Sequence, residues 1–273
     1  GESISYAQAN ERIAKLAGML RARLGDKRGE RIVMLSRNSS FMLLVHYACA
    51  RAGQIFVPLN WRLAPPEVEM LIKDAAPAAV FFQPEFEAHA APAVARVADG
   101  CSFRIEGDGA GVIASAAPAE PVYAGVNPDM HAPIILLYTS GTSGRAKGVI
   151  ITSSTALYSS LNYGLSAEVS ASSVFLCDMP LFHVAGLMAA SRTPLLYGGT
   201  VLVSQKFDPV VSVKNLLNED YGVTHYFCVT QMGRKPSANC RVFRSFKPAA
   251  RRIRRRRCGN GRKTACARST VSA

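Results

Sequence analysis

The chain has 273 residues, 49% of them hydrophobic, which is enough for a buried core of ordinary size. No stretch approaches the roughly 18 consecutive apolar residues that span a bilayer, and no secretion signal is recognisable. The net charge of +13 is uneven: residues 1–232 carry 18 Lys+Arg and 19 Asp+Glu, whereas residues 233–273 carry 14 Lys+Arg and no acid. We therefore expect a soluble, cytoplasmic, globular chain without an integral membrane segment and with a basic tail.

The first third of the chain reads as short apolar strands that alternate with helices. Ser5 and Gln8 form a capping box at the start of an amphipathic helix. The alternation continues as strand 31–36, helix 41–53, strand 54–60, helix 65–75 and strand 78–82. Residues 84–130 are rich in Ala, Pro, Gly and Glu and have weak periodicity, so we expect an irregular connection there with room for one helix and one strand.

The alternation resumes after residue 148. The pattern predicts helix 152–163, strand 174–177, helix 184–190, strand 200–204, helix 209–220 and strand 224–229. Strands and helices that alternate at this spacing indicate an α/β fold with mixed, largely parallel sheets flanked by helices. Residues 233–273 have no such period and no acid, and we expect that tail to be disordered.

A loop of hydroxyl residues and glycines, LLYTSGTSGRAKGV (136–149), follows an apolar strand. Its glycines let backbone N–H groups turn toward an anion, and its hydroxyls and one lysine add donors, which favours a polyphosphate ligand over a plain surface turn. The spacing differs from the Walker A motif, because Lys147 is three residues past Gly144. The sequence therefore predicts a phosphate site but not a P-loop NTPase.

This loop resembles the signature loop of the adenylate-forming (AMP-binding) enzymes. Segments on both sides are similar to the same superfamily in order and spacing, among them RIVMLSRNSSFMLLVHYACARAGQIFVPLNWRL and MPLFHVAGL, over about residues 3–232. The segment PLFHVAGL is similar to the acyl-CoA synthetase branch. The resemblance implies that residues 1–232 are a partial N-terminal domain of such an enzyme and that residues 233–273 are an unrelated tail.

The resemblance also implies a reaction, an ATP-dependent carboxylate–CoA ligation through an acyl-adenylate. ATP, Mg²⁺, coenzyme A and a carboxylic acid would be the partners. The residues that map onto phosphate binding are Thr139, Ser140, Gly141, Thr142, Ser143, Gly144, Lys147 and Gly148. Ser143 and Ala146 depart from the commoner threonine and proline. His183 matches a family position near the acyl pocket, although a packed core histidine is an equal alternative. No catalytic residue or metal ligand is assigned.

Several family features have no counterpart after Met232. These are the adenine segment, the acidic metal motif and the late catalytic lysine. We hypothesise that the reading frame changes near Met232. Sheet edges and apolar faces would then lack their partners, so we expect the chain as written to be inactive and prone to aggregation. The alternatives are a non-catalytic pseudoenzyme fragment and a nucleic-acid-binding protein that uses RRIRRRRCGNGRK, although an unselected basic tail is favoured over the latter. The acid that is activated and the oligomeric state are not predicted.

Overall fold

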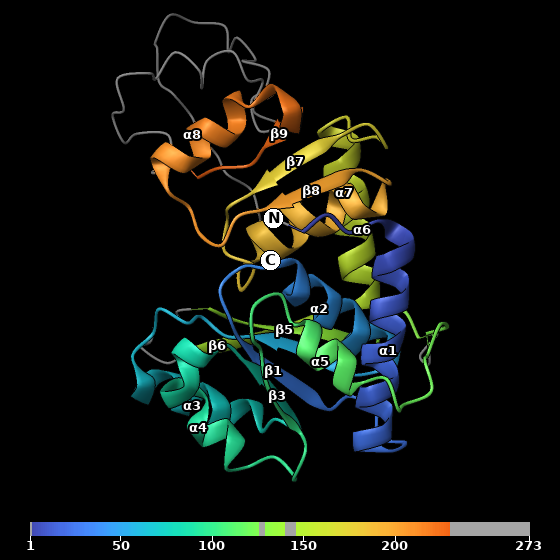
Figure 1. Ribbon diagram of the computed structural model, residues 1–273, viewed down its shortest axis with the longest axis vertical. Coiled ribbons are helices and arrows are strands. Elements are labelled where there is room, and N and C mark those ends of the chain that lie inside the picture. The colour runs from blue at the N-terminus through green and yellow to red at the C-terminus, as the bar shows by residue number, and fades with distance from the viewer. Residues whose placement is uncertain (1, 126–128, 140–145, 230–273) are drawn as a thin grey trace, which may run out of the picture.

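The computed structural model describes residues 2–125, 129–139 and 146–229, which form two sheets with their helices (Figure 1). The six-stranded sheet and its helices comprise α1 (Tyr6–Leu24), β1 (Arg31–Leu35), α2 (Ser40–Ala52), β2 (Ile55–Pro58), α3 (Pro65–Ala75), β3 (Ala79–Phe82), η1 (Pro84–Phe86), α4 (Glu87–Val94), β4 (Ser102–Arg104), α5 (Ala110–Ser115), β5 (Pro133–Thr139) and β6 (Lys147–Thr152). The three-stranded sheet and its helices comprise α6 (Ser153–Ser166), β7 (Val174–Cys177), η2 (Ala185–Arg192), α7 (Thr193–Leu196), β8 (Thr200–Val203), α8 (Pro209–Leu217), η3 (Glu219–Tyr221) and β9 (His225–Tyr226).

The six-stranded sheet has the order β4-β3-β1-β2-β5-β6. Its first five strands run parallel, and β6 pairs antiparallel to β5 at the edge. Helices connect the parallel strands, as they must when successive strands point the same way. The predicted mixed, largely parallel α/β architecture is confirmed.

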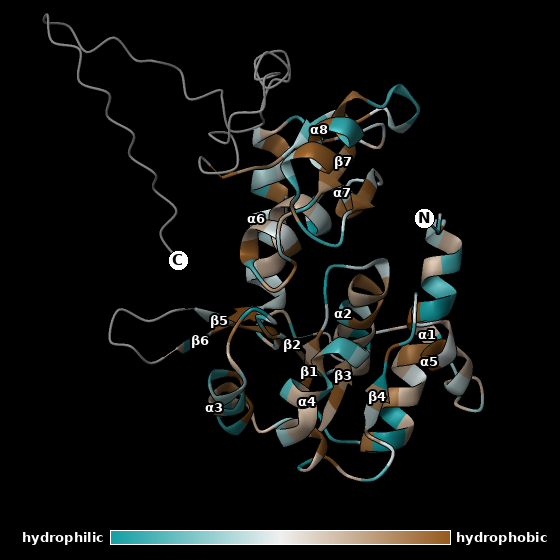
Figure 2. Ribbon diagram, turned by 60° about the vertical axis from the view of Figure 1, so that its left-hand side comes forward, coloured by the Kyte–Doolittle hydropathy of each residue, from teal (hydrophilic) through white to brown (hydrophobic). Residues whose placement is uncertain are grey.

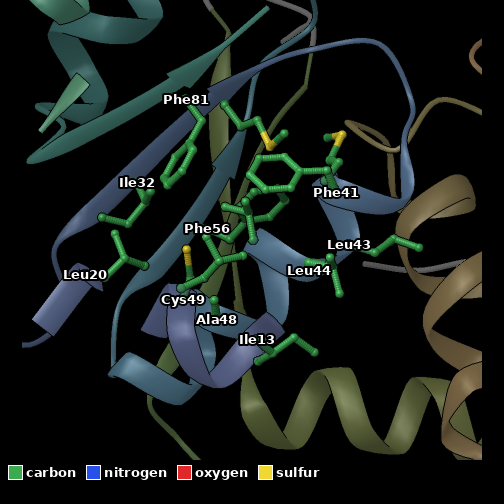
Figure 3. Packing of buried hydrophobic residues seen from close by; sticks show 14 of the residues in the cluster. Ile13, Leu20, Ile32, Phe41, Leu43, Leu44, Ala48, Cys49, Phe56 and Phe81 are labelled. Atoms are coloured by element: carbon green, nitrogen blue, oxygen red, sulfur yellow. The ribbon is translucent and has the colours of Figure 1, made fainter. Parts of the chain in front are cut away.

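Successive residues of β1 point to opposite faces of this sheet and enter different cores. Ile32 and Met34 join a cluster with α1 and α2, whereas Val33 and Leu35 pack with α3 and α4. Figure 3 shows the first of these cores, between the sheet and α2. The apolar residues concentrate in the strands, while the outer helices carry the polar colours (Figure 2). Burial on both faces explains why these strands read as unbroken apolar runs.

The three-stranded sheet is parallel and has the order β8-β7-β9. Its central strand β7 is the most buried, with Phe175, Leu176 and Cys177 all inaccessible or nearly so. Strand β8 is only half-buried, and β9 is two residues long. This sheet therefore depends on one central strand.

Asn38, in the loop after β1, joins the two sheets. Its buried side-chain amide donates to the carbonyl oxygens of Met179 at 2.8 Å and Ser204 at 3.1 Å, and it accepts from the backbone N–H of Leu181 at 2.9 Å. Its own backbone N–H donates to the carbonyl of Gln205 at 3.3 Å. Since these partners follow β7 and β8, one amide links the carboxyl ends of strands from both sheets.

The connection over 84–130 is more ordered than predicted. It holds two helices, α4 and α5, the 3₁₀ turn η1 and the strand β4. Helix α4 packs Ala90 and Ala93 into the core through side chains too small to give a strong periodic signal. The alanine-rich composition therefore gave no sequence signal for two helices in this segment.

Two predicted elements near the second sheet also differ. The helix expected over 184–190 is a π-helix, Ala185–Arg192, that continues into α7. The strand expected over 224–229 pairs only at His225 and Tyr226. Both differences lie in segments that follow β7 and β9 in the chain.

Candidate functional site

The ends of the predicted phosphate loop lie side by side on the β5–β6 hairpin. Thr139 closes β5 and is paired in register with Lys147, which opens β6. The Thr139 hydroxyl lies 3.5 Å from the carbonyl oxygen of Lys147, and both residues are exposed. The hairpin therefore brings the lysine back to the first hydroxyl of the loop.

The middle of this loop lies outside the described residues. The predicted phosphate-binding residues concerned are Ser140, Gly141, Thr142, Ser143 and Gly144. Their roles stay predictions, as do those of the residues at the two ends.

Gly148 lies inside β6 rather than in the loop, and it is opposite Tyr138. A Cβ atom built there would lie 2.9 Å from the Leu136 side chain of the neighbouring strand. A larger residue at this position would therefore displace the flexible end of the Leu136 side chain.

The hairpin is anchored to the opposite helix layer by Tyr138. Its phenol donates to the Asp74 carboxylate of α3 at 2.6 Å. Burial raises the pKa of Tyr138, and the hydrogen bond to Asp74 raises it further, so the phenol stays protonated at neutral pH. The contact fixes the end of β5 from which the loop begins.

Lys147 is available to bind an anion. Across the part of the chain that the structure describes, no carboxylate lies within ion-pair distance of its ammonium group. A cation and a hydroxyl at the same end of a hairpin suit a phosphate group, because phosphate oxygens accept hydrogen bonds from both. Within the same residues, no group of three His, Cys, Asp or Glu side chains is arranged to hold a metal ion.

A cavity of about 380 Å³ contains His183, the second predicted site residue. The residues that line it are Arg62, Met179, Pro180, His183, Ala185, Phe207 and Val229. Most of them follow a strand of one sheet or the other, so the cavity opens where the carboxyl ends of both sheets meet. Open α/β sheets commonly bind ligands at this edge.

His183 is exposed and is not a core residue. Its backbone N–H donates to the carbonyl of Pro180 at 3.1 Å, and its ring lies 6.0 Å from that of Phe182. The alternative of a packed core histidine is wrong, because the chain turns at Pro180 and directs Phe182 inward instead. The role of His183 in an acyl pocket stays a prediction.

The sequence analysis did not single out Arg62 or Phe207. Arg62 follows β2 and Phe207 follows β8, so they are 145 positions apart in the chain. The contacts of Asn38, together with an apolar core to which both sheets contribute, bring these two loops together. The only local feature that could have indicated a site role for Arg62 was a positive charge just after an apolar strand.

A buried carboxylate lies directly behind the cavity. Asp178 is 1% exposed and accepts from the hydroxyls of Ser212 at 2.5 Å and Tyr226 at 3.0 Å. Burial raises its pKa, and the two hydrogen bonds oppose that shift. Because Asp178 precedes Met179 and Tyr226 lies three residues before Val229, the cluster supports two walls of the cavity.

Another cavity, of about 500 Å³, lies between α1 and residues 120–125. It is lined by Arg21, Asp26 and Glu120 among others, and it contains none of the predicted site residues. Of the helices described, none has both the length and the apolar character to cross a membrane.

Comparison with known protein families gives a match over most of the chain. The AMP-binding enzyme family model matches residues 1–255. The match passes Met232, where the sequence analysis ends the domain, so that boundary stays a prediction.

Curated relatives include CoA ligases. A feruloyl-CoA synthase of an Amycolatopsis species is 34% identical over 213 residues, which cover 77% of this chain and 40% of that enzyme. A 2-succinylbenzoate–CoA ligase of Bacillus cereus strain Q1 is 30% identical over 237 residues, which cover 85% of this chain and 44% of that enzyme. The chain thus spans less than half the length of these two relatives.

Solved structures share the fold. ATP-bound MatB from Rhodopseudomonas palustris superposes with a TM-score of 0.75 at 27% identity, over 86% of this chain and 47% of that one. The N-terminal domain of FACL13 from Mycobacterium tuberculosis gives 0.71 at 27% identity, over 84% and 56%. The similarity therefore covers more than four fifths of this chain.

Proposed function

Because the chain belongs to the AMP-binding enzyme family, with acyl-CoA ligases among its relatives, we propose that it supplies the phosphate-binding portion of an ATP-dependent carboxylate–CoA ligase. In this reaction a carboxylate attacks the α-phosphate of Mg·ATP and releases pyrophosphate, and the thiol of CoA then displaces AMP. The difficult part is the negative charge that develops on the departing pyrophosphate.

The chain's own residues act on that charge. The Lys147 ammonium would neutralise one phosphate oxygen, and the Thr139 hydroxyl would donate to another from the opposite strand. The hydroxyls of Ser140, Thr142 and Ser143 would add further donors. Mg²⁺ would enter with the phosphates of ATP, and no magnesium ligand is proposed within this chain.

The observation that carries the proposal is the β5–β6 hairpin itself. It holds an exposed lysine without a described carboxylate partner against an exposed hydroxyl, at the carboxyl end of a parallel strand. An exposed lysine without a partner is common by itself, so the proposal is supported by its register opposite a hydroxyl at the end of a parallel strand.

Binding of Mg·ATP to the full chain tests the proposal. Lys147→Ala removes a charged partner of a phosphate, so we expect the dissociation constant to rise about 10-fold or more. Lys214→Ala is the matched control, because Lys214 is also exposed but lies on α8. Equal affinities in wild type and Lys147→Ala, measured by calorimetry, would contradict a phosphate role for the hairpin.

Carboxylate-dependent exchange of labelled pyrophosphate into ATP tests the reaction. The acids to compare are ferulate and 2-succinylbenzoate, for which the relatives are named, together with a long-chain fatty acid. Exchange with one acid would identify the substrate class. A chain that binds Mg·ATP but supports no exchange with any acid would instead be the non-catalytic fragment.

A further inference from the structure

Two arginines flank the indole of Trp61, and they differ in one respect. The guanidinium carbon of Arg37 lies 4.8 Å from the ring centroid and that of Arg62 lies 5.0 Å from it. Arg37 also donates twice to the Glu85 carboxylate, at 2.7 and 3.1 Å. Arg62 has no carboxylate partner in the described ranges. The two side chains are therefore alike in stacking and different in charge neutralisation.

Arg62 lines the same cavity as His183. Its guanidinium is also 5.7 Å from the ring of Phe182, so aromatic rings hold it on more than one side. A guanidinium stacked on aromatic faces keeps its N–H groups at its edge, where they are available to an oxyanion. Since Arg62 lines the cavity, that edge is accessible to a ligand there.

The other residues that line the cavity indicate which kind of ligand it can bind. None of the residues that line it is acidic, so nothing within it competes for Arg62. Five of the seven are apolar, namely Met179, Pro180, Ala185, Phe207 and Val229. A volume of about 380 Å³ with one cation and mostly apolar walls suits an anion that carries an apolar body.

We propose that Arg62 is a specificity-determining residue that binds an oxyanion of the ligand in this cavity, while the body of the ligand lies against Phe207 and Met179. This rests on the proposed ligase function for the identity of the ligand. Two co-substrates supply the same chemistry: the acid, if it carries a second carboxylate, and CoA, through a phosphate group. Both accept a bidentate hydrogen bond from a guanidinium.

A purely structural role for Arg62 makes a different prediction. If its only task were to cover Trp61, then Arg62 and Arg37 would be equivalent, and loss of either would leave ligand affinity unchanged. Arg62 is exposed, so its replacement leaves the buried core intact. The pair therefore provides a matched control within one aromatic cluster.

The test measures binding of four probes to the full chain by calorimetry: CoA, pantetheine, octanoate and octanedioate. Octanedioate adds one carboxylate to the body of octanoate, and CoA adds a phosphorylated adenosine group to pantetheine. For the oxyanion-carrying member of one pair, we expect Arg62→Gln to weaken binding about 10- to 100-fold, Arg62→Lys to weaken it less, and Arg37→Gln to leave it unchanged. Loss for CoA but not pantetheine identifies the phosphate, and loss for octanedioate but not octanoate identifies the second carboxylate.

Three results would overturn the inference. The first is wild-type affinity of Arg62→Gln for all four probes, the second is an equal loss for both members of each pair, and the third is no binding of any probe to the wild type. Mg·ATP affinity measured on the same variants separates this inference from the proposed function. If Mg·ATP fails to bind while the oxyanion effect of Arg62 persists, the ligase proposal fails and the anion site remains.

Discussion

The two sheets of this chain are stabilised in different ways. The six-stranded sheet buries apolar side chains on both faces, and Phe56 and Phe81 are inaccessible at its centre. The three-stranded sheet contributes Cys177 to the same large cluster, has two further clusters of three buried residues each, and carries a buried polar group, Asp178, that connects β7 with α8 and β9. The first sheet is therefore held by packing on both faces, whereas the second combines a smaller share of that core with a few directional contacts close to the cavity.

Truncation of one phenylalanine in each sheet gives the largest expected effects. Phe56→Ala removes a ring from a large cluster that cannot collapse, so we expect a loss of about 3–5 kcal/mol in unfolding free energy. Phe175→Ala acts in a small cluster next to half-exposed Tyr163 and Tyr197, where side chains can relax into the space. We expect the lower end of that range or less, measured by urea denaturation.

The comparison would fail if Phe175→Ala were as costly as Phe56→Ala and unfolded both sheets together. Hydrogen exchange resolves this point. We expect faster exchange everywhere in Phe56→Ala, but faster exchange in Phe175→Ala only in β7, β8 and their helices.

Removal of the Asp178 carboxylate is the next largest expected effect. Asp178→Ala removes the carboxylate that accepts from the hydroxyls of Ser212 and Tyr226, at about 1–3 kcal/mol for each hydrogen bond lost. Relief of the buried charge offsets part of that cost. We therefore expect a net loss of about 2 kcal/mol in unfolding free energy. Hydrogen exchange should become faster in α8 and β9, and its rate should not change in β1 to β3.

A double-mutant cycle with Tyr226→Phe tests the network directly. If the two side chains are coupled, the double variant loses less stability than the sum of the single variants. Additive losses would mean that the carboxylate stabilises β7 through some other contact.

The contributions of His46 and Asp178 to stability change in opposite directions with pH. His46 of α2 is fully buried, and its Nε2 lies 3.1 Å from Nη1 of Arg192, which can only donate. Burial and the charge of Arg192 hold the pKa of His46 well below its usual range. The unfolded chain therefore takes up the proton first, and stability falls as the pH drops below about 6.5, by at most about 1.4 kcal/mol per pH unit.

Asp178 has the opposite sign. Its folded pKa is raised above the ordinary value by burial, so its contribution is greatest below about pH 4 and is lost as the pH rises through the folded pKa. Thermal melts between pH 6.5 and 5 separate the two groups. We expect His46→Gln to flatten the slope there, and an unchanged slope would show that His46 is not the titrating group.

The sequence predicted the local elements of the structure better than the contacts between the two sheets. The capping box of Ser5 and Gln8 is present, and α3 begins and ends at the predicted residues 65 and 75. These elements depend on local patterns, which a sequence displays directly. The segments whose alternation predicts the fold are also the segments that resemble the family.

The cavity was not predicted, for a physical reason. Arg62, His183 and Phe207 meet because Asn38 and a shared apolar core connect the two sheets, and no local pattern encodes a contact across 141 or 166 positions. His183 could be placed beside a ligand only through its resemblance to a family position. The interior of the phosphate loop lies outside the described residues, so its predicted donors await the binding experiments.

The smallest expected effects come from two helix caps, one near each sheet. Ser39 caps α2 by accepting from the backbone N–H of Met42 at 3.1 Å, and Asp208 caps α8 by accepting from those of Val210 at 2.9 Å and Val211 at 3.1 Å. Replacement of either by alanine removes a cap, which costs about 1 kcal/mol.

The two caps should differ in where that cost appears. Helix α2 packs on the centre of the six-stranded sheet, so Ser39→Ala should lower the midpoint of global unfolding. Helix α8 buries only Ser212 and Leu216, so Asp208→Ala should leave that midpoint nearly unchanged and instead speed hydrogen exchange within α8. Equal shifts of the global midpoint in both variants would mean that the two sheets unfold as one cooperative unit, in which case the cavity between them would open only when the whole chain unfolds.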